Sequence, residues 1–346
     1  MAHLGYEIRN INPKDFFLQS SSEAKIKFLL RYAVFAPSTH NSQPWLFEIR
    51  GNSCKIYNDP NIQLKEADPI NRDLYISFGC LIENLIITAK YFGVLLEIKY
   101  SNEKTQEDLI AEIFFQNLNT VQVTNIDPSL EPLLIAITKR VNARGIFEPT
   151  LISEEIKNKI SSLSDFSNIA IHLVQNKEQI QHIAELTAEG LKQAYANPSF
   201  RKEMSEWMHN SLSKKRRGIP GYSLRMPTII SFFFPAFIRR FNLSKKVAQL
   251  NIKSIGSAPI IAVITSNQNS KQAWLDIGRL FERITLNLNI LGIKTSIFVA
   301  SIEMGFGEQI KEIIGSNNNP QFLFCIGYMN YEQKPNLRMS VEERMK

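Results

Sequence analysis

A run of short polar residues, Ser38-Thr39-His40-Asn41-Ser42-Gln43, lies between Pro37 and Pro44. Its hydroxyl, amide and imidazole groups offer many small donors and acceptors within a few positions. On a firmly held backbone, such a loop suits a polyhydroxylated ligand. The alternative is an ordinary helix-to-strand connection in which these side chains satisfy only their own backbone.

A second group consists of Arg140, Asn142 and Arg144. In an extended segment, alternate residues point to the same side, so these three side chains would face one ligand together. Two guanidinium groups and an amide in this spacing favour an anion. The alternative is a basic turn on the surface, because such spacing also arises by accident.

The first run resembles a known signature. Residues 37–45 read Pro-Ser-x-x-Asn-x-Gln-Pro-Trp, which is similar to the flavin-contacting element of the nitroreductase superfamily. The resemblance implies FMN as the cofactor and NAD(P)H as the reductant. It places six residues of the loop on the flavin: Pro37, Ser38, Thr39, His40, Asn41 and Gln43.

The same resemblance gives roles to the second group. The element looks like the Arg-x-Ser-x-Arg/Lys motif of that superfamily, with Asn142 in place of the usual serine. It implies that Arg140 binds the FMN phosphate, that Asn142 contacts the ribityl chain or ring edge, and that Arg144 lies on the O2 side of the ring.

Further contacts follow from later segments. The sequence around Arg338 resembles the closing segment of the superfamily, where a basic residue binds the phosphate; Asn336 stands where a second cation is often found. The residues after the second long helix match the segment whose backbone amides face N5 of the flavin. These implied contacts are Ser296, Ile297, Phe298 and, as a ring contact, Asn251.

The resemblance also implies how the chain is divided. Residues 1–130 carry the Pro-Ser-x-x-Asn loop and residues 131–346 carry the arginine element and Arg338. We therefore expect two fused nitroreductase-like halves that mimic a homodimer, which is the pattern of the Acg-like branch. Further matches to that branch are Asp68-Pro69 with Arg72, Asn197-Pro198 with Trp207, and residues 218–222.

The elements that must position these residues can be read from periodicity. Helices are predicted at 22–35, 74–92, 133–140, 153–163, 177–196 and 274–291, and strands at 46–50, 54–57, 94–100, 107–117, 170–174, 259–265 and 322–328, with 293–299 as strand or loop. Gly51-Asn52 predicts a hairpin. Asn84–Gly93 can be laid over Arg283–Gly292, which indicates an internal duplication.

The predicted fold class is α+β, with antiparallel-rich sheets flanked by helices. The segment from about residue 200 to about residue 250 has no counterpart in a minimal nitroreductase half. We interpret it as a lid whose apolar side, including Phe232-Phe233-Phe234, faces the flavin. The alternative is a loop that associates with a membrane or a partner.

Composition limits the remaining classes. The chain has 346 residues, 44% of them hydrophobic and 21% charged, with three dispersed cysteines and a net charge of +7. These values favour a globular protein, with the cytoplasm as the expected location. The histidines show no spacing typical of metal ligands. The basic run Lys214-Lys215-Arg216-Arg217 is interpreted as a solvated loop.

The leading functional hypothesis is an FMN-dependent oxidoreductase. NAD(P)H would reduce FMN at N5, and a quinone or nitroaromatic-like acceptor would reoxidise it without a catalytic side chain. The alternative is a protein that binds or sequesters FMN with little turnover. A third hypothesis, a basic nucleic-acid or membrane-surface protein, rests on charge alone. We expect no membrane span, no nucleic-acid partner, and either a monomer or a homodimer.

Overall fold

The computed structural model describes residues 5–101 and 108–346. Its first half contains one antiparallel sheet in the order β1-β2-β4-β3. In chain order the elements are α1 (Ser22–Ala33), β1 (Trp45–Arg50), β2 (Ser53–Asn58), α2 (Arg72–Tyr91), β3 (Leu95–Tyr100) and β4 (Leu109–Gln116). Glu107, the first residue of the predicted fourth strand, lies outside the described residues.

The second half repeats this plan after the connecting helix α3 (Glu131–Lys139). Its antiparallel sheet has the order β5-β8-β10-β9. The elements are α4 (Glu154–Ser162), β5 (Ile169–Val174), β8 (Ile260–Ser266), α9 (Lys271–Ile290), β9 (Lys294–Ile297), α10 (Ala300–Glu303), α11 (Gly307–Ile314) and β10 (Asn319–Gly327). The predicted α+β class with antiparallel sheets is confirmed, and 293–299 contains a strand.

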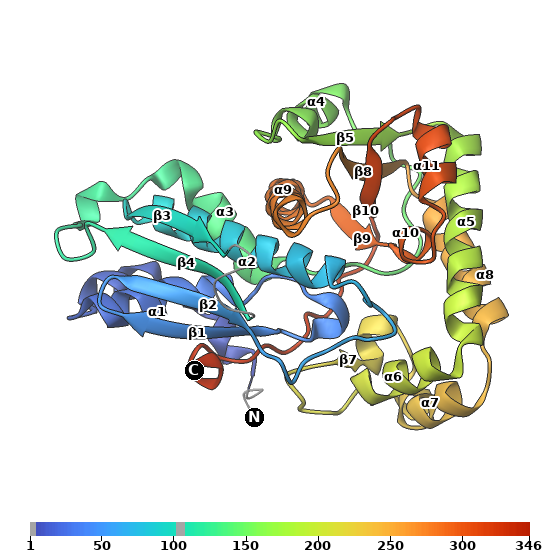
Figure 1. Cartoon of the computed structure of the whole chain (residues 1–346), viewed down its shortest axis with the longest axis horizontal. Helices are drawn as coiled ribbons and strands as arrows, with labels where there is room; N and C mark the ends of the chain where they lie inside the picture. The colour runs from blue at the N-terminus through green and yellow to red at the C-terminus, as the bar shows by residue number, and fades with distance from the viewer. Residues whose placement is uncertain (1–4, 102–107) are drawn as a thin grey trace.

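The largest difference between the halves lies between their first two strands. Gly51-Asn52 joins β1 to β2 in a tight hairpin, in which Gly51 has φ 58°. Residues 175–259 occupy the same place in the second half. They form α5 (Lys177–Ala196), α6 (Pro198–Trp207), β6 (Met208–His209), β7 (Ile219–Pro220), α7 (Thr228–Arg240) and α8 (Ser244–Gly256). The insertion is therefore longer than the 200–250 that we expected, and α6 and α7 form its lower layer (Figure 1).

Local sequence explains where several helices begin. The Oγ of Ser21 accepts a hydrogen bond from the amide of Ala24 (3.2 Å) at the start of α1. Asn197 does the same for the amide of Ser199 (2.9 Å), with Pro198 at the first position of α6. Side-chain caps of this kind satisfy amides that have no partner inside the helix.

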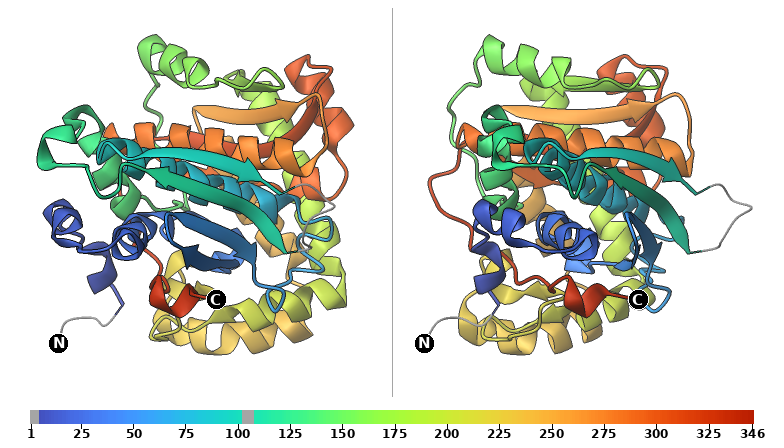
Figure 2. Two further views of the ribbon diagram at one scale, coloured as in Figure 1. Left: turned by 60° about the vertical axis from the view of Figure 1, so that its left-hand side comes forward. Right: turned by 90° about the vertical axis from the view of Figure 1, so that its left-hand side faces the viewer.

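The long helices α2 and α9 pack against each other between the two sheets (Figure 2). They meet at Gly79 and Gly278, where a Cβ atom on either residue would lie 2.0 Å from a backbone oxygen of the opposite helix: Leu275 for Gly79 and Ile76 for Gly278. The sequence overlay that pairs Asn84 with Arg283 also pairs these residues, so the contact is reciprocal. This is the geometry of a two-fold dimer interface within one chain.

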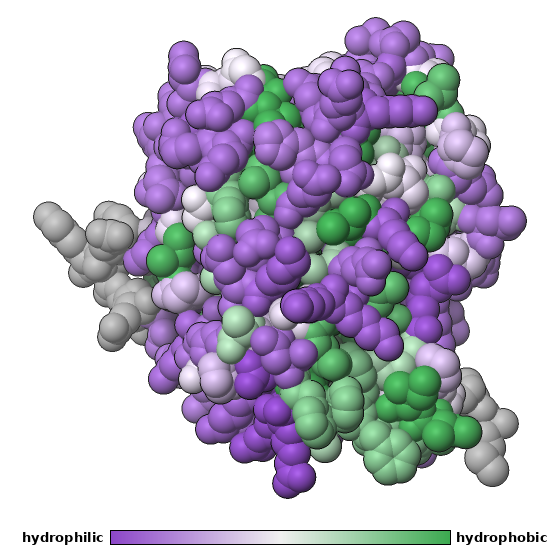
Figure 3. All heavy atoms as spheres, turned by 90° about the vertical axis from the view of Figure 1, so that its right-hand side faces the viewer, coloured by the Kyte–Doolittle hydropathy of each residue, from purple (hydrophilic) through white to green (hydrophobic). Residues whose placement is uncertain are grey.

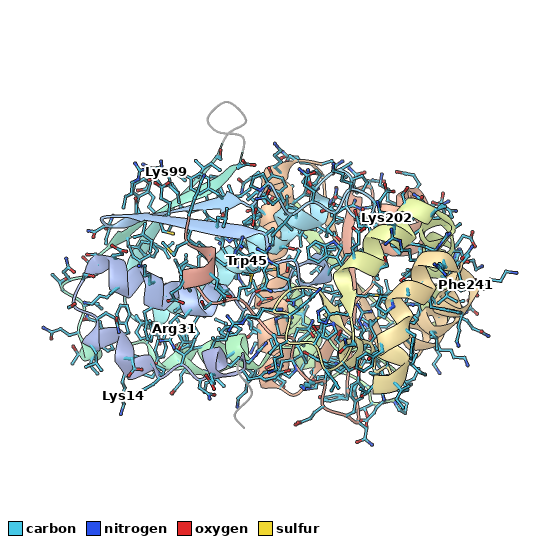
Figure 4. The ribbon with its side chains drawn as sticks, turned by 90° about the horizontal axis from the view of Figure 1, so that it is seen from below. Lys14, Arg31, Trp45, Lys99, Lys202 and Phe241 are labelled. Carbon is cyan, nitrogen blue, oxygen red and sulfur yellow. The ribbon has the colours of Figure 1, made fainter. Side chains whose placement is uncertain are left out.

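The first half also holds a segment of the second. The C-terminal segment lies beside β1, where Met345 bridges Phe47, the amide of Lys346 donates to the Phe47 oxygen (2.8 Å), and Arg344 donates to the Trp45 oxygen (2.7 Å). Trp45 itself is fully buried in the middle of the molecule (Figure 4). The chain termini therefore tie the halves together.

Helix α7 corrects one expectation. We predicted that the phenylalanine-rich segment turns its apolar side inward, but Phe232 and Phe233 are exposed, and only Ser231 and Ile238 of this helix are buried. Over the described parts of the chain, every helix is too short or too polar to cross a bilayer.

Candidate functional site

The loop after α1 has a strained backbone. Among non-glycine residues, His40, Asn41 and Gln43 have φ of 53°, 55° and 50°, in the left-handed region that such residues seldom adopt. The amide of Gln43 donates to the Oγ of Ser38 (2.9 Å), which closes the loop on itself. Strain of this kind persists only where surrounding contacts hold it, and it concentrates at functional sites.

Asn41 and Gln43 supply those contacts. The Nδ2 of Asn41 lies within hydrogen-bond distance of three carbonyl oxygens, those of Arg216 (3.1 Å), Gly218 (3.2 Å) and Leu337 (3.3 Å). The Nε2 of Gln43 donates to the Arg216 oxygen (2.6 Å), and its Oε1 accepts from the amide of Met339 (2.8 Å). Their side chains thus join the loop to the insertion and to the C-terminal segment, and their flavin contact stays a prediction.

The basic run 214–217 contributes to this junction, which the interpretation as a solvated loop did not foresee. The carbonyl of Arg216 is the shared acceptor, and its guanidinium is ion-paired with Glu343. Arg217 lies 3.4 Å from a carboxylate oxygen of Asp59. The pKa of Arg217 is lowered, mainly by burial.

Three arginines from three segments meet near the loop. Arg338 is buried and donates to the Oδ1 of Asn41 and to the Ala36 oxygen (3.4 Å). Burial and the neighbouring charges of Arg9 and Arg140 hold its pKa well below the usual range, and Glu282 opposes this effect. Glu282 is fully buried, with its Oε1 3.3 Å from the Nε of Arg140. Glu282 interacts with Arg140 and Arg338, and Arg9 adds a third guanidinium beside them, so these four side chains carry an excess of positive charge.

Arg9 is the member of this cluster that sequence reasoning missed. Its guanidinium donates to the Thr138 oxygen and to the Asn336 oxygen (3.1 Å), and its Cζ lies 4.9 Å from the centre of the Phe35 ring. The pKa of Arg9 is lowered to about 10 by burial and by Arg140. The resemblance implies a second cation at the position that Asn336 occupies. Because Arg9 donates to the Asn336 oxygen, it brings a positive charge to this position from another segment.

Arg144 has different neighbours, four residues from Arg140. Its amide donates to the Oη of Tyr331 (2.8 Å), and Tyr195 and Tyr331 are its electrostatic neighbours. His40 is also an electrostatic neighbour of Arg144. The ring centres of His40 and Trp207 are 6.4 Å apart. Since four residues span at most about 14 Å, the arginine cluster and this aromatic group lie at two ends of one short segment.

Asn142 lies between these ends. Its Oδ1 accepts from the amide of Ile297 (3.1 Å), and the amide of Ala143 donates to the Thr295 oxygen (2.9 Å). The arginine element therefore runs alongside β9. The amide of Phe298 donates to the Leu323 oxygen (3.1 Å), so the amides of Ile297 and Phe298 both have protein acceptors.

Asn251 and the other loop residues complete the predicted set. Asn251 is half-buried on α8 and donates to the Val247 oxygen (2.8 Å); one turn later, Ser254 donates to the Gly145 oxygen (2.5 Å) beside Arg144. Thr39 donates to Asp73 (3.5 Å), and Pro37 is half-buried where α1 ends. Asn251 thus has a hydrogen bond only to its own helix among the contacts of the described residues, and the flavin contact of each of these residues stays a prediction.

His40 leads to a prediction about acid stability. Burial, with a smaller effect of Arg144, lowers its pKa from 6.5 to about 4. The unfolded imidazole takes a proton as the pH falls through 6.5, but the folded one does so only near 4, so stability present above pH 6.5 is lost on the way down to pH 4. When the pH is lowered from about 7 to about 4.5, the free energy of unfolding should fall by roughly 1 to 3 kcal/mol more for the native chain than for the His40→Asn variant.

Asparagine is the suitable replacement because it tolerates the left-handed backbone of this position. Chemical denaturation of both proteins at the two pH values measures the difference. If the two lost equal stability, His40 would not be the group responsible.

No protein-family model matches the chain. Two curated proteins of Mycobacterium tuberculosis, provisionally named NAD(P)H nitroreductases, are 32% identical to it over 68 residues. By this match, a stretch of 68 residues of the chain is similar to part of these two nitroreductases. The match spans 20% of this chain and 20% of each relative, so the chain covers about a fifth of the length of these curated relatives.

Solved nitroreductase structures show weaker overall likeness. One with bound FMN from Desulfitobacterium hafniense is 17% identical, with a TM-score of 0.39, and the overlap covers 60% of this chain and 93% of that one. A provisionally assigned nitroreductase from Anabaena variabilis is 11% identical, with a TM-score of 0.46 and coverage of 80% and 69%.

Proposed function

We propose that this nitroreductase-related chain binds FMN where its two halves meet and transfers hydride equivalents from NAD(P)H to a small acceptor. The observation that carries the proposal is the buried arginine cluster. Arg9, Arg140 and Arg338 lie beside one another, and Glu282 offsets the charges of Arg140 and Arg338. A phosphate dianion would neutralise the remaining excess, and buried charges in proteins are normally paired.

The polar atoms of the site fit this cofactor. Within the described residues, Nε of Arg338, Nη1 of Arg140, Nε2 of His40 and Oγ of Ser296 are buried without a hydrogen-bond partner. Buried polar groups left in this way are uncommon. The phosphate needs cationic donors, while the ribityl hydroxyls and the ring edge need small polar groups. The four atoms supply both kinds, from both halves of the chain.

When bound, FMN would supply the hydride chemistry. Arg140 and Arg338 would hold its phosphate, with Arg9 adding charge. Arg144 would offer a positive group at the other end of the segment, where negative charge develops at the pyrimidine edge. The aromatic rings of Trp207, Tyr195 and Tyr331 would enclose the site near Arg144 and exclude water. The proposal gives no side chain the role of acid or base.

The arrangement of fused halves supports the Acg-like assignment. Both halves have the same strand order, and α2 and α9 make a reciprocal contact. The flavin loop comes from one half, and the arginine element from the other. The chain would therefore build one site without a second copy, and its oligomeric state and cytoplasmic location remain predictions.

A second candidate is FMN sequestration with little turnover. It is favoured by Trp207, which α6 of the insertion places beside His40. If α6 stayed in place, a nicotinamide could not approach the ring. Turnover distinguishes the candidates, because simple sequestration permits none.

The test begins with the absorption spectrum of the purified chain, before and after denaturation. We expect one FMN per chain, rapid bleaching by NADH or NADPH under anaerobic conditions, and reoxidation by a quinone or a nitroarene. Stoichiometric FMN without bleaching would favour sequestration. A colourless protein that does not take up added FMN would exclude both candidates.

A further inference from the structure

Helix α7 exposes apolar residues in a regular row. Ile229, Phe233 and Phe237 follow one another at intervals of four and therefore lie along one face of the helix. Their exposed fractions are 77%, 71% and 47%. The opposite face carries Ser231 and Ile238, which are buried. The helix thus turns its more apolar side to solvent.

The neighbouring residues extend this row into a patch. Ile230, Phe232 and Phe241 are also exposed, by 52%, 51% and 53%. Figure 3 shows hydrophobic side chains gathered over the lower part of the molecule, where α6 and α7 lie. We call this set of six residues, with Ile229, Phe233 and Phe237, the α7 patch. Contiguous apolar surface of this kind marks an interaction site.

The charge around the α7 patch is one-sided. Residues 207–275 contain no aspartate or glutamate, and residues 207–256 contain ten lysines and arginines. The rest of the chain has 30 lysines and arginines and 33 acids, so the whole positive excess lies in this stretch. Arg239, Arg240, Lys245 and Lys246 are exposed at the end of α7 and the start of α8.

The cations and the apolar row belong to one edge of the molecule. Figure 4 shows α6 and α7 seen from below, with Lys202 on α6 and Phe241 directly after α7. Arg240 falls on the same helical face as Phe233, because seven residues make nearly two turns. Glu206, which lines the groove between α6 and α7, is the last acid before the acid-free stretch.

We propose that the α7 patch docks on an anionic lipid bilayer. An interfacial helix lies in the plane of the membrane, with its aromatic and aliphatic side chains below the headgroups and its basic residues among them. Helix α7 provides the apolar row, and Arg239, Arg240, Lys245 and Lys246 provide attraction to anionic headgroups. A second copy of this chain fits less well, because two such surfaces would bring like charges together.

Sedimentation with vesicles tests the proposal. The full chain is mixed with phosphatidylcholine vesicles, either pure or with about 30% phosphatidylglycerol, at low and high salt. We expect binding to the anionic vesicles only, and weaker binding at high salt. The double variant Ile229→Ser/Phe233→Ser should bind at least about tenfold more weakly, since it removes two inserting side chains.

A matched control is available elsewhere on the surface. Leu18 and Leu151 are 77% and 84% exposed, and Leu18→Ser/Leu151→Ser should leave vesicle binding unchanged. Arg239→Gln/Arg240→Gln should weaken it by about fivefold for each cation removed. Failure to bind anionic vesicles, equal weakening by the control pair, or a dimer in light scattering that the Ile229→Ser/Phe233→Ser variant abolishes would overturn the proposal.

Discussion

Replacing Arg338 with methionine is expected to weaken FMN binding by roughly 30- to 1,000-fold. Arg338 is buried beside Arg9 and Arg140, and in the described structure its Nε has no hydrogen-bond partner. Removing one partner of a buried charge pair costs roughly 2 to 4 kcal/mol, which converts to this range. The side chain therefore has both the charge and a free donor for a phosphate.

The effect on folding should be smaller than the effect on binding. The variant loses the hydrogen bonds to Asn41 and to the Ala36 oxygen. It also removes a buried charge whose pKa is lowered by burial and by two like charges. These contributions oppose each other, since desolvation and repulsion destabilise the native chain.

Flavin fluorescence titration measures the affinity, and thermal unfolding of the flavin-free protein measures the stability. Arg31→Met is the matched control, because Arg31 lies on α1, with its Cζ 5.2 Å from the centre of the Phe28 ring. An Arg338→Met protein that kept its FMN affinity would exclude the arginine cluster as the phosphate site.

Gly79→Ala is expected to destabilise the chain by about 3 kcal/mol or more, or to prevent folding. The new Cβ would lie 2.0 Å from the Leu275 oxygen and 2.9 Å from the Cα of Gly278. Both are backbone atoms, so α2 and α9 must move apart along their whole contact. Overpacking a core typically lowers the free energy of unfolding by about 1 to 3 kcal/mol. A clash with backbone atoms should cost as much as the upper end of this range or more.

Gly278→Ala should have an effect of the same size, because its Cβ would lie 2.0 Å from the Ile76 oxygen. Gly307→Ala is the control: Gly307 begins α11, and a Cβ there meets nothing within 4 Å. Denaturant unfolding compares the three variants. If Gly79→Ala and Gly278→Ala were as stable as Gly307→Ala, the helices would not cross at these glycines.

Periodicity and local signals were enough to predict most elements of the fold. The helix predicted over 177–196 has those bounds, Gly51-Asn52 forms the hairpin, and Ser153 caps α4 through its Oγ. The long helices were predicted because their apolar residues recur over many turns. The overlay of Asn84–Gly93 on Arg283–Gly292 pairs Gly79 with Gly278 when it is extended upstream by five residues. Such features depend on neighbours in the chain, which a sequence displays directly.

Only the tertiary structure decided how the site is assembled. Arg9 carries no motif, and it joins Arg338 and Arg140 because the N-terminal and C-terminal segments both cross to the junction of the halves. Asn41 and Gln43 are predicted flavin contacts, and only the tertiary structure shows that their side chains also hold the segments around Arg216 and Leu337. These partners lie more than 170 positions away in the chain.

Helix α7 shows the same limit. The sequence shows an apolar segment here, and we expected its apolar side to face inward, but Phe232, Phe233 and Phe237 are exposed. The hydrophobic pattern specifies which residues share a face of a helix, whereas packing against α6 specifies which face is covered. The sequence by itself therefore determined the elements, the α+β class and the residue types of the site. The tertiary structure decided which charges meet and which surface stays exposed, because both depend on contacts between segments that are distant in the chain.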